Sequence, residues 1–408
     1  MVSSSLIRKL FSASYIQRWN DKLRPIDFIE LDKHALKMVI AYIIGSFEED
    51  KEGFSWREII EGCLFELLQK IVLTDIKSPV FYMIREHKEK YRQLNEFVYN
   101  DIQPTIAPLG KDVCDRFKTF FEHTDDTINK RILTASSTYA SLWEFAIIRH
   151  GDPHGYENAE IENAIMRKLQ THDDLAGMQQ LTTHRDYQHF IDRCGELRYQ
   201  VRWAGVHRIP HTSVLNHSLF VGLLSYLFSL EVNACPKRCY NNFFTGLFHD
   251  LPEVLTRDII SPIKRSVEGL KEILGEYEKQ QMEKIIFPLL PIACVQEMHM
   301  FTEREKEGVI TVDGALQWVS SDEINTQYNE DCFNSRDGVF IKLADELAAY
   351  VESAEALRNG CTSERFTNAM QKVKEYYDAA GMVGGINTRE LFKDLWQRDT
   401  CLLSSDRL

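Results

Sequence analysis

The sequence predicts an all-α protein made of two tandem helical bundles. Apolar residues recur at the spacing of helices through most of the chain, and Pro and Gly interrupt them. The 408 residues, 44% hydrophobic and 27% charged, have an ordinary globular composition that favours two domains. The third observation is an internal repeat, which divides the chain near its middle.

The helical spacing is clearest in four segments: 36–45, 218–230, 242–249 and 341–357. Breaks between helices are predicted at Ser78-Pro79, at 151–155 and at Ser261-Pro262, because Pro and Gly end periodic segments.

The segment 300–338 differs from the helical pattern. Residues 308–312 and 317–319 look like short strands amid acidic residues and Asn. We interpret the segment as a surface insertion with a small β-hairpin around 305–320, and it is a candidate lid.

Three matches in the same order indicate the internal repeat. The first begins with Arg18-Trp19 in one copy and Arg202-Trp203 in the other, and a His-containing apolar helix follows each. The matched segments are 18–34 with 202–217, 63–79 with 247–262, and 143–151 with 352–360. We therefore expect a first domain over 1–165 and a second domain over 178–400.

In this register the first copy lacks the polar residues of the second, which makes it a degenerate copy without metal ligands. Only His34 remains as a counterpart, to His217. The other pairs are Glu66 with His249, Leu67 with Asp250, Lys70 with Glu253, and Ser136 with Asp345.

Charge and cysteine content exclude several classes. The net charge of −13, without a basic stripe, argues against general nucleic-acid binding, because such affinity comes from neutralising phosphates. No run approaches the roughly 18 apolar residues of a membrane span. The nine scattered cysteines, without a secretory signal, are typical of reduced thiols in a cytoplasmic protein.

The second half carries a candidate metal site. His249 and Asp250 are adjacent on a predicted helix, His217 lies on an earlier helix, and Asp345 on a later one. Two imidazoles and two carboxylates suit one divalent ion such as Co, Mn, Mg, Fe, Ni or Zn, and leave positions for water and phosphate. Taken singly, each of these residues could instead be structural.

Four neighbouring residues are candidates for substrate chemistry. Glu253 shares a helix face with the His-Asp pair and could protonate a leaving oxygen, or it could be solvent-exposed. Asp258 could orient a water or cap a helix. Arg202 offers donors to a phosphate and Trp203 a flat wall, although a surface Arg beside a core Trp is equally ordinary.

The order His217, His249-Asp250, Asp345 resembles the H…HD…D signature of the HD-domain metal-dependent phosphohydrolases. More narrowly, the run 248–264, the upstream Arg202-Trp203 and the segment 342–350 resemble the YfbR-like 5′-deoxynucleotidases. The resemblance covers about residues 185–375 well.

This resemblance implies an all-α bundle with one central divalent metal, and hydrolysis of (deoxy)nucleoside 5′-monophosphates to nucleoside and phosphate. Glu253 and Asp258 would be the catalytic residues. His217, His249, Asp250 and Asp345 would hold the metal, and Arg202, Trp203 and Lys264 would bind the substrate. The family usually has Glu where this chain has Asn216, and Gly where it has Arg257.

Two alternatives to this function stay open. One is a nucleotide-sensing protein with little turnover. The other is another HD-domain activity, such as a cyclic-nucleotide phosphodiesterase or a di-iron oxygenase, that uses His207 and His211 for a second metal. The expected partner is a small nucleotide, with no nucleic acid or membrane. The fused copy is expected to serve as an intramolecular pseudo-dimer partner, or to be a regulatory pocket that retains Arg18, Trp19 and His34; a homodimer is the other arrangement.

Overall fold

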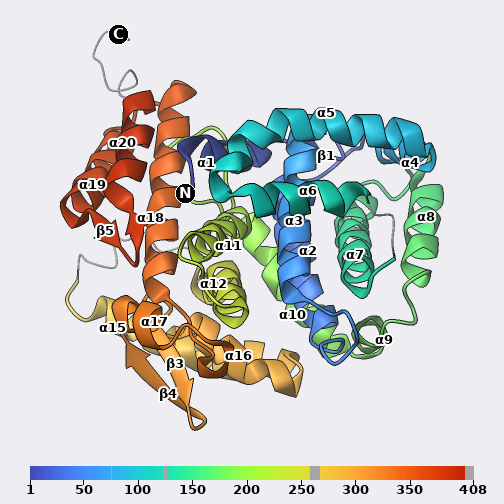
Figure 1. Ribbon diagram of the computed structural model, residues 1–408. Coiled ribbons are helices and arrows are strands. Elements are labelled where there is room, and N and C mark those ends of the chain that lie inside the picture. The colour runs from blue at the N-terminus through green and yellow to red at the C-terminus, as the bar shows by residue number, and fades with distance from the viewer. Residues whose placement is uncertain (75, 123–125, 258–266, 400–408) are drawn as a thin grey trace. The chain divides into compact units, whose positions relative to one another are not determined.

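The computed structural model describes residues 1–74, 76–122, 126–257 and 267–399, and these are mostly helical (Figure 1). The all-α fold class is thereby confirmed. The chain divides into two compact units. Unit 1 comprises Met1–Phe11, Leu197–Lys284 and the chain from Gln296 onward, and unit 2 comprises Ser12–Glu196 and Ile285–Val295.

The boundaries of these units differ from the predicted domains, 1–165 and 178–400. Helix α1 (Ser4–Phe11) belongs to unit 1, because its apolar face packs there and the ring of Phe11 meets that of Phe220 edge-on at 5.5 Å. Helix α10 (Arg185–Glu196) belongs to unit 2, because it packs against a core helix of that unit. The periodicity of a short amphipathic helix shows that it has a buried face but not which core covers that face.

Three helices form the centre of unit 1: α11 (Val214–Glu231), α12 (Pro236–Phe248) and α18 (Gly338–Arg358), which pack against one another (Figure 1). Helix α11 is apolar on all sides and almost fully buried, as expected for a central helix. It is long and apolar enough to cross a membrane, but 89% of it is buried inside the protein.

The other elements of unit 1 surround this centre. They are η3 (Leu197–Tyr199), α13 (Glu253–Thr256), α15 (Leu270–Gln281), β3 (Gly308–Val312), β4 (Ala315–Val319), α17 (Ser321–Gln327), η6 (Asp331–Phe333), α19 (Glu364–Ala380), β5 (Met382–Val383), β6 (Ile386–Asn387) and α20 (Thr388–Asp399). Helix α16 (Ile292–Thr302) and η4 (Met282–Ile286) straddle the boundary with unit 2.

Two glycines let α11 and α12 approach closely. A Cβ atom on Gly246 would lie 2.6 Å from the Cα of Gly222, and one on Gly222 would lie 2.9 Å from the carbonyl oxygen of Phe243. Such distances are shorter than van der Waals contact, so only glycine fits at this crossing. The crossing matters for function because His249 follows Gly246 by one helical turn.

The predicted hairpin is confirmed. Strands β3 and β4 pair antiparallel, with Gly308 opposite Val319 and Val312 opposite Ala315. Asp313 and Gly314 form the two-residue connection, and both have positive φ, which a tight hairpin turn of this kind requires.

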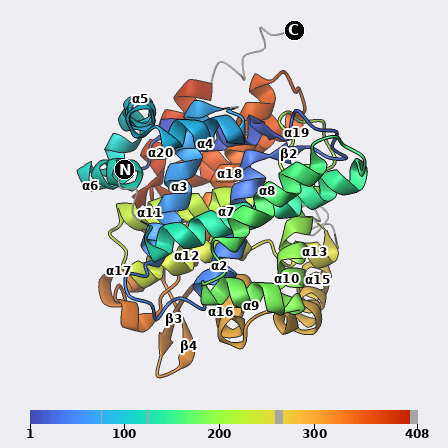
Figure 2. The same cartoon turned by 90° about the vertical axis from the view of Figure 1, so that its right-hand side faces the viewer.

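Unit 2 is also a helical bundle. Helix α2 (Glu30–Gly45) is buried along its length and packs against α3 (Trp56–Leu73), α7 (Ile128–Gly151), α9 (Ala176–Thr183) and α10. Helix α8 (Asn158–Gln170) runs beside α7 (Figure 2). The remaining elements are η1 (Ser12–Tyr15), β1 (Gln17–Arg18), β2 (Phe28–Ile29), α4 (Ser78–Glu86), α5 (Lys88–Ile106), η2 (Ala107–Leu109), α6 (Lys111–Glu122) and η5 (Phe287–Leu289).

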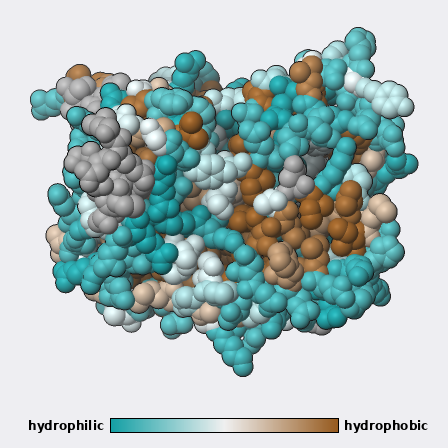
Figure 3. Space-filling view, turned by 90° about the horizontal axis from the view of Figure 1, so that it is seen from above, coloured by the Kyte–Doolittle hydropathy of each residue, from teal (hydrophilic) through white to brown (hydrophobic). Residues whose placement is uncertain are grey.

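Most of the predicted helices and breaks are found. Each of the four periodic segments lies in a helix, with the fourth inside α18 and the third ending at the cap of α12. Ser78-Pro79 begins α4. The break predicted at 151–155 falls in the connection 152–157 between α7 and α8, with Gly151 as the last residue of α7. The break at Ser261-Pro262 lies outside the described residues. The face shown in Figure 3 is hydrophilic over most of its area and has one large cluster of hydrophobic side chains.

We predict that Gly246→Ala destabilises unit 1 by about 1–3 kcal/mol, because the added methyl group must push α11 and α12 apart. Gly275→Ala on the exposed face of α15 is the matched control. A Cβ there meets nothing within 4 Å, so this change should be neutral or stabilising by about 0.5–1 kcal/mol. Urea unfolding of both variants measures the difference, and equal midpoints would contradict the close crossing.

Candidate metal centre

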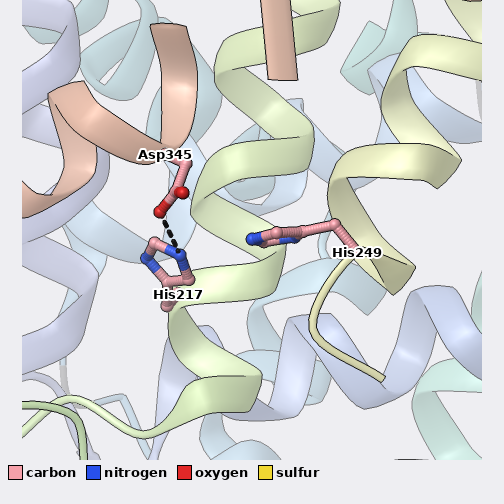
Figure 4. Close-up of side chains that lie close together, drawn as sticks. All are labelled: His217, His249 and Asp345. Atoms are coloured by element: carbon pink, nitrogen blue, oxygen red, sulfur yellow. Dashed lines mark ion pairs between the residues drawn. The ribbon is translucent and has the colours of Figure 1, made fainter. Parts of the chain in front are cut away.

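Side chains from three separate segments converge in the centre of unit 1. His217 lies on α11, His249 caps the end of α12, and Asp345 lies on α18. One ligand atom of each lies within 4.8 Å of the others, and Figure 4 shows the two imidazole rings and the carboxylate facing a common space. Residues 128 positions apart in the sequence thus meet at one point.

The protonation of His249 is set by its own helix. Its Nδ1 lies 2.8 Å from the carbonyl oxygen of Gly246, and because a carbonyl can only accept, Nδ1 donates this bond. The lone pair of the neutral ring is therefore on Nε2. The Nε2 atoms of His217 and His249 are buried and have no hydrogen-bond partner within the described part of the chain.

Asp250 adds a second carboxylate beside these rings. Its Oδ2 lies 3.2 Å from Nε2 of His249 and 3.6 Å from Nε2 of His217. Asp345 contributes Oδ1 at 3.2 Å from the same nitrogen of His217. The four predicted ligands therefore surround one small space, although Asp250 falls outside the tightest group of three.

The electrostatics of this cluster are strongly perturbed. Burial lowers the pKa of His217, and Arg202 adds to that effect. Burial would also lower the pKa of His249, but the Asp250 carboxylate outweighs it and raises this pKa. Burial opposes ionisation of Asp250, yet the His249 ring holds the pKa of that carboxyl well below its usual range.

The donor set fits a divalent ion. Two buried imidazole nitrogens without hydrogen-bond partners and two ionised carboxylates are the ligands that Mn, Co, Fe, Ni and Zn accept. The carbonyl of Gly246 supplies the outer hydrogen bond that orients a metal-binding His. Four protein ligands would leave room on such an ion for water or a substrate oxygen.

A buried carboxylate, Glu352, positions the Arg-Trp pair and was not predicted as a site residue. Its Oε2 accepts from Nε1 of Trp203 at 2.8 Å and from Nε of Arg202 at 3.3 Å. Burial would raise the pKa of Glu352, but Arg202 and Arg208 outweigh it and lower this pKa to about 2. One feature of the sequence points to this residue: the matched segments 143–151 and 352–360 both contain a Glu.

Arg202 and Trp203 have different surroundings. Nη1 of Arg202 lies 3.7 Å from Oδ2 of Asp250, so the guanidinium reaches the edge of the candidate metal centre. The ring of Trp203 packs against Phe366 at 5.3 Å, in a cluster with Ala356 and Cys361. Trp203 is thus part of a small core, and its connection to the centre runs through Glu352.

Lys306, from the predicted insertion, is the second residue that sequence reasoning missed. Its Nζ lies 2.7 Å from Oδ2 of Asp345, and this carboxylate raises the pKa of the lysine. The hairpin β3–β4 follows directly after it. No spacing in the sequence indicates this contact, because the two residues are 39 positions apart on unrelated elements.

The remaining candidates have mixed outcomes. Glu253 begins α13 and is nearly buried, with its amide donating to the carbonyl of Asp250 at 3.0 Å. Its interpretation as a solvent-exposed carboxylate is therefore wrong. Asp258 and Lys264 lie outside the described residues. Arg257 has φ 65°, which explains why glycine suits this position and makes the Arg a strained choice.

Two other groups of possible ligands lie apart from the centre. The ring centres of His207 and His211 lie 6.3 Å apart. Among the described residues, neither belongs to the ligand group of His217, His249 and Asp345. Glu283, His299 and Glu303 form a second, more exposed cluster with ligand-like spacing.

Comparison with known proteins agrees with this geometry. The sequence model of the HD domain matches residues 194–379. A 5′-deoxynucleotidase of Photobacterium profundum is 25% identical over 195 residues, which is 46% of this chain and 83% of that protein. The 5′-deoxynucleotidases of Yersinia pestis and Yersinia pseudotuberculosis are each 24% identical over 156 residues, 35% of this chain and 77% of theirs.

We predict that Asp345→Asn weakens Mn²⁺ or Co²⁺ binding by at least about tenfold, because it removes an ionised ligand from the centre. Glu303→Gln is the control, since it removes the same charge from the second cluster. Equilibrium dialysis of the two variants decides which group holds the ion. Weaker binding in Glu303→Gln alone would assign the metal to the other cluster.

We also predict a pH-dependent loss of stability in Glu352→Gln. A pKa lowered from 4.5 to about 2 stabilises the folded state above pH 4.5 by roughly 3 kcal/mol, and this is lost as the pH falls toward 2. The difference in unfolding free energy between wild type and variant should therefore be largest at neutral pH and shrink below pH 5. A difference that does not change with pH would contradict the role of the charge.

Proposed function

From the premise that this chain contains an HD domain, we propose that it is a metal-dependent phosphohydrolase of nucleoside 5′-monophosphates, with deoxynucleotides preferred. The observation that carries this proposal is the convergence of His217, His249, Asp250 and Asp345, with the guanidinium of Arg202 at their edge. The names of the relatives support the same reaction class.

The four ligands would hold one divalent ion, which supplies Lewis acidity toward water and the phosphate when bound. Arg202 would bind the phosphate. Its Nε is fixed by Glu352, while Nη1 points toward Asp250, so the rest of its planar fork is oriented for a phosphate beside the ion. The buried carboxylate thus positions the arginine without contacting substrate.

Glu253 would transfer a proton to the departing 5′-oxygen. It lies three residues beyond Asp250 at the start of α13 and is nearly buried, next to the candidate ligands along the chain. Asp258 would orient the attacking water from the sugar side, and Lys264 would add a second cation for the phosphate. Both roles rest on the resemblance of the run 248–264 to the family.

Trp203 would set the choice between deoxyribose and ribose. Its indole is fixed at both ends, by the hydrogen bond to Glu352 and by packing on Phe366, so it forms a rigid wall. An apolar wall of this kind discriminates against an added hydroxyl by up to about a hundredfold.

We further propose that unit 2 is a degenerate copy of unit 1, and that the protein acts in the cytoplasm. The eight cysteines within the described residues are all free, which supports a reducing compartment.

The test is phosphate release from deoxy- and ribonucleoside 5′-monophosphates with Mn²⁺, Co²⁺, Mg²⁺ or Zn²⁺. We expect metal-dependent release, a drop of at least about a hundredfold in kcat for Glu253→Gln as an acid is removed, and a lower deoxy-to-ribo ratio for Trp203→Phe.

Asp250→Ala should abolish release, and Glu305→Gln, an acid outside the centre, should not. No release from any substrate by a protein that has bound metal would overturn the hydrolase and favour a nucleotide-sensing protein. Release only from cyclic substrates would favour a phosphodiesterase.

A further inference from the structure

Unit 2 contains a cavity of about 290 Å³, near the lower end of the roughly 300–1,000 Å³ of small-molecule sites. Helices α2 to α8 line it, together with Arg18. The metal centre does not use it, since the cavity lies wholly within the other unit.

The cavity occupies the position in unit 2 that the metal centre occupies in unit 1. Both units contain an Arg-Trp pair in which the Trp has a positive φ, and in both the Trp donates a hydrogen bond to a buried Glu. Trp19 Nε1 donates to Glu144 at 2.8 Å, and Trp203 Nε1 donates to Glu352 at 2.8 Å. The residue before each Arg pairs with the cap of the next helix, Gln17 with Ile29 and Val201 with Ser213.

This shared frame identifies the counterparts of the ligands. Lys33 in unit 2 and His217 in unit 1 each lie four residues after the cap of their helix, so they are counterparts. Ser137 in unit 2 and Asp345 in unit 1 each lie seven residues before the buried Glu, so they are counterparts too. Lys33 donates to the Oγ of Ser137, so a lysine–serine hydrogen bond replaces the histidine–aspartate pair. The predicted counterparts, His34 and Ser136, are each wrong by one residue.

The replacement leaves a positively charged cavity without a metal site. The two groups with metal-ligand spacing among the described residues both belong to unit 1. The described lining contains six cationic residues against three acidic ones, in a chain whose net charge is −13. The cations are Arg18, Lys33, Lys70, Arg85, Lys130 and Lys168, and the acids are Glu30, Glu66 and Asp126.

The acidic side chains already have partners. Glu30 pairs with Arg18, Glu66 with Lys37, and Asp126 with Arg131. Lys70 and Arg85, in contrast, make no ion pair with any carboxylate that the structure describes. Lys33 is 6% exposed, and burial lowers its pKa to about 7, the behaviour of an amine whose charge is not compensated.

Aromatic rings complete the lining. Tyr82, Tyr91, Phe81, Phe120 and Phe121 all border the cavity, and the ammonium of Lys168 lies 4.4 Å from the centre of the Tyr82 ring. Cations and aromatic rings in one cavity suit a ligand that has both a phosphate and a flat ring.

We propose that the cavity of unit 2 binds a nucleoside phosphate and does not hydrolyse it. Lys33, Lys70 and Arg85 contact the phosphate, and the aromatic side chains contact the base. Arg18 mainly serves the fold, since Glu30 and Glu144 already engage its guanidinium.

The experiment uses the full chain with Asp250→Ala, dialysed against labelled deoxyadenosine 5′-monophosphate in EDTA. It reads binding alone, so a failure of the hydrolase proposal would leave its result unchanged. We expect one bound equivalent, and a loss of affinity of about tenfold or more when Lys70→Ala/Arg85→Ala is added, since two charged donors are removed. Lys33→Met, which keeps the side-chain length, should act in the same direction.

Lys88→Ala/Arg167→Ala removes the same charges from exposed positions outside the cavity and should retain affinity within about twofold. Circular dichroism shows whether the Lys33→Met chain is folded, and the Lys70→Ala/Arg85→Ala variant answers the question if it is not. Absence of binding, or binding that the Lys70→Ala/Arg85→Ala change leaves intact, would overturn the proposal. Equal affinity for inorganic phosphate would overturn the assignment of a nucleoside.

Discussion

Burying a carboxylate in an apolar core costs several kcal/mol unless donors surround it, and both units are organised around such a group. In unit 1, Glu352 is 1% exposed and takes hydrogen bonds from Trp203, Arg202 and Thr212. These donors lie on the loop before α11, while Glu352 lies on α18. If the loop moved away from α18, the buried carboxylate of Glu352 would lose its hydrogen-bond donors. Glu352 therefore fixes the position of the loop.

This constraint also fixes the metal centre. His217 follows the loop by one turn of α11, and Asp345 precedes Glu352 by two turns of α18. Holding the loop against α18 therefore sets the distance between imidazole and carboxylate. The glycine crossing of α11 and α12 sets the third position, because His249 follows Gly246. The hydrogen bonds to Glu352 and the close crossing at Gly222 and Gly246 thus together position the candidate ligands.

Much of this could be predicted from the sequence. Helical spacing identifies α11 and α18 because each buries a long apolar stretch, and the strand-like residues after Gly308 identify the hairpin. The order His, His-Asp, Asp selects four residues that the fold brings together. These patterns are local: the periodicity of apolar residues predicts the helices and strands, and the His and Asp residues predict metal ligands.

The rest depends on contacts that no local pattern contains. A shift of one residue along a helix turns a side chain by about 100°, but helices buried on all sides tolerate either register, so the match of Lys33 to His217 emerges only from the caps and hydrogen bonds. The place of α1 in unit 1 and the contact of Lys306 with Asp345 depend on tertiary packing between segments far apart in the chain.

The ammonium of Lys306 affects the charge balance of the candidate metal centre. Without an ion, the site would hold two carboxylates facing buried imidazoles, and mutual repulsion would favour opening of the bundle. Lys306 pairs with Asp345 from the hairpin side, so this carboxylate has a counterion within the chain itself. A divalent ion at this position would compete with the lysine, which is 43% exposed, for the Asp345 carboxylate. The folded state of unit 1 therefore does not need a bound cation to balance the charge of Asp345.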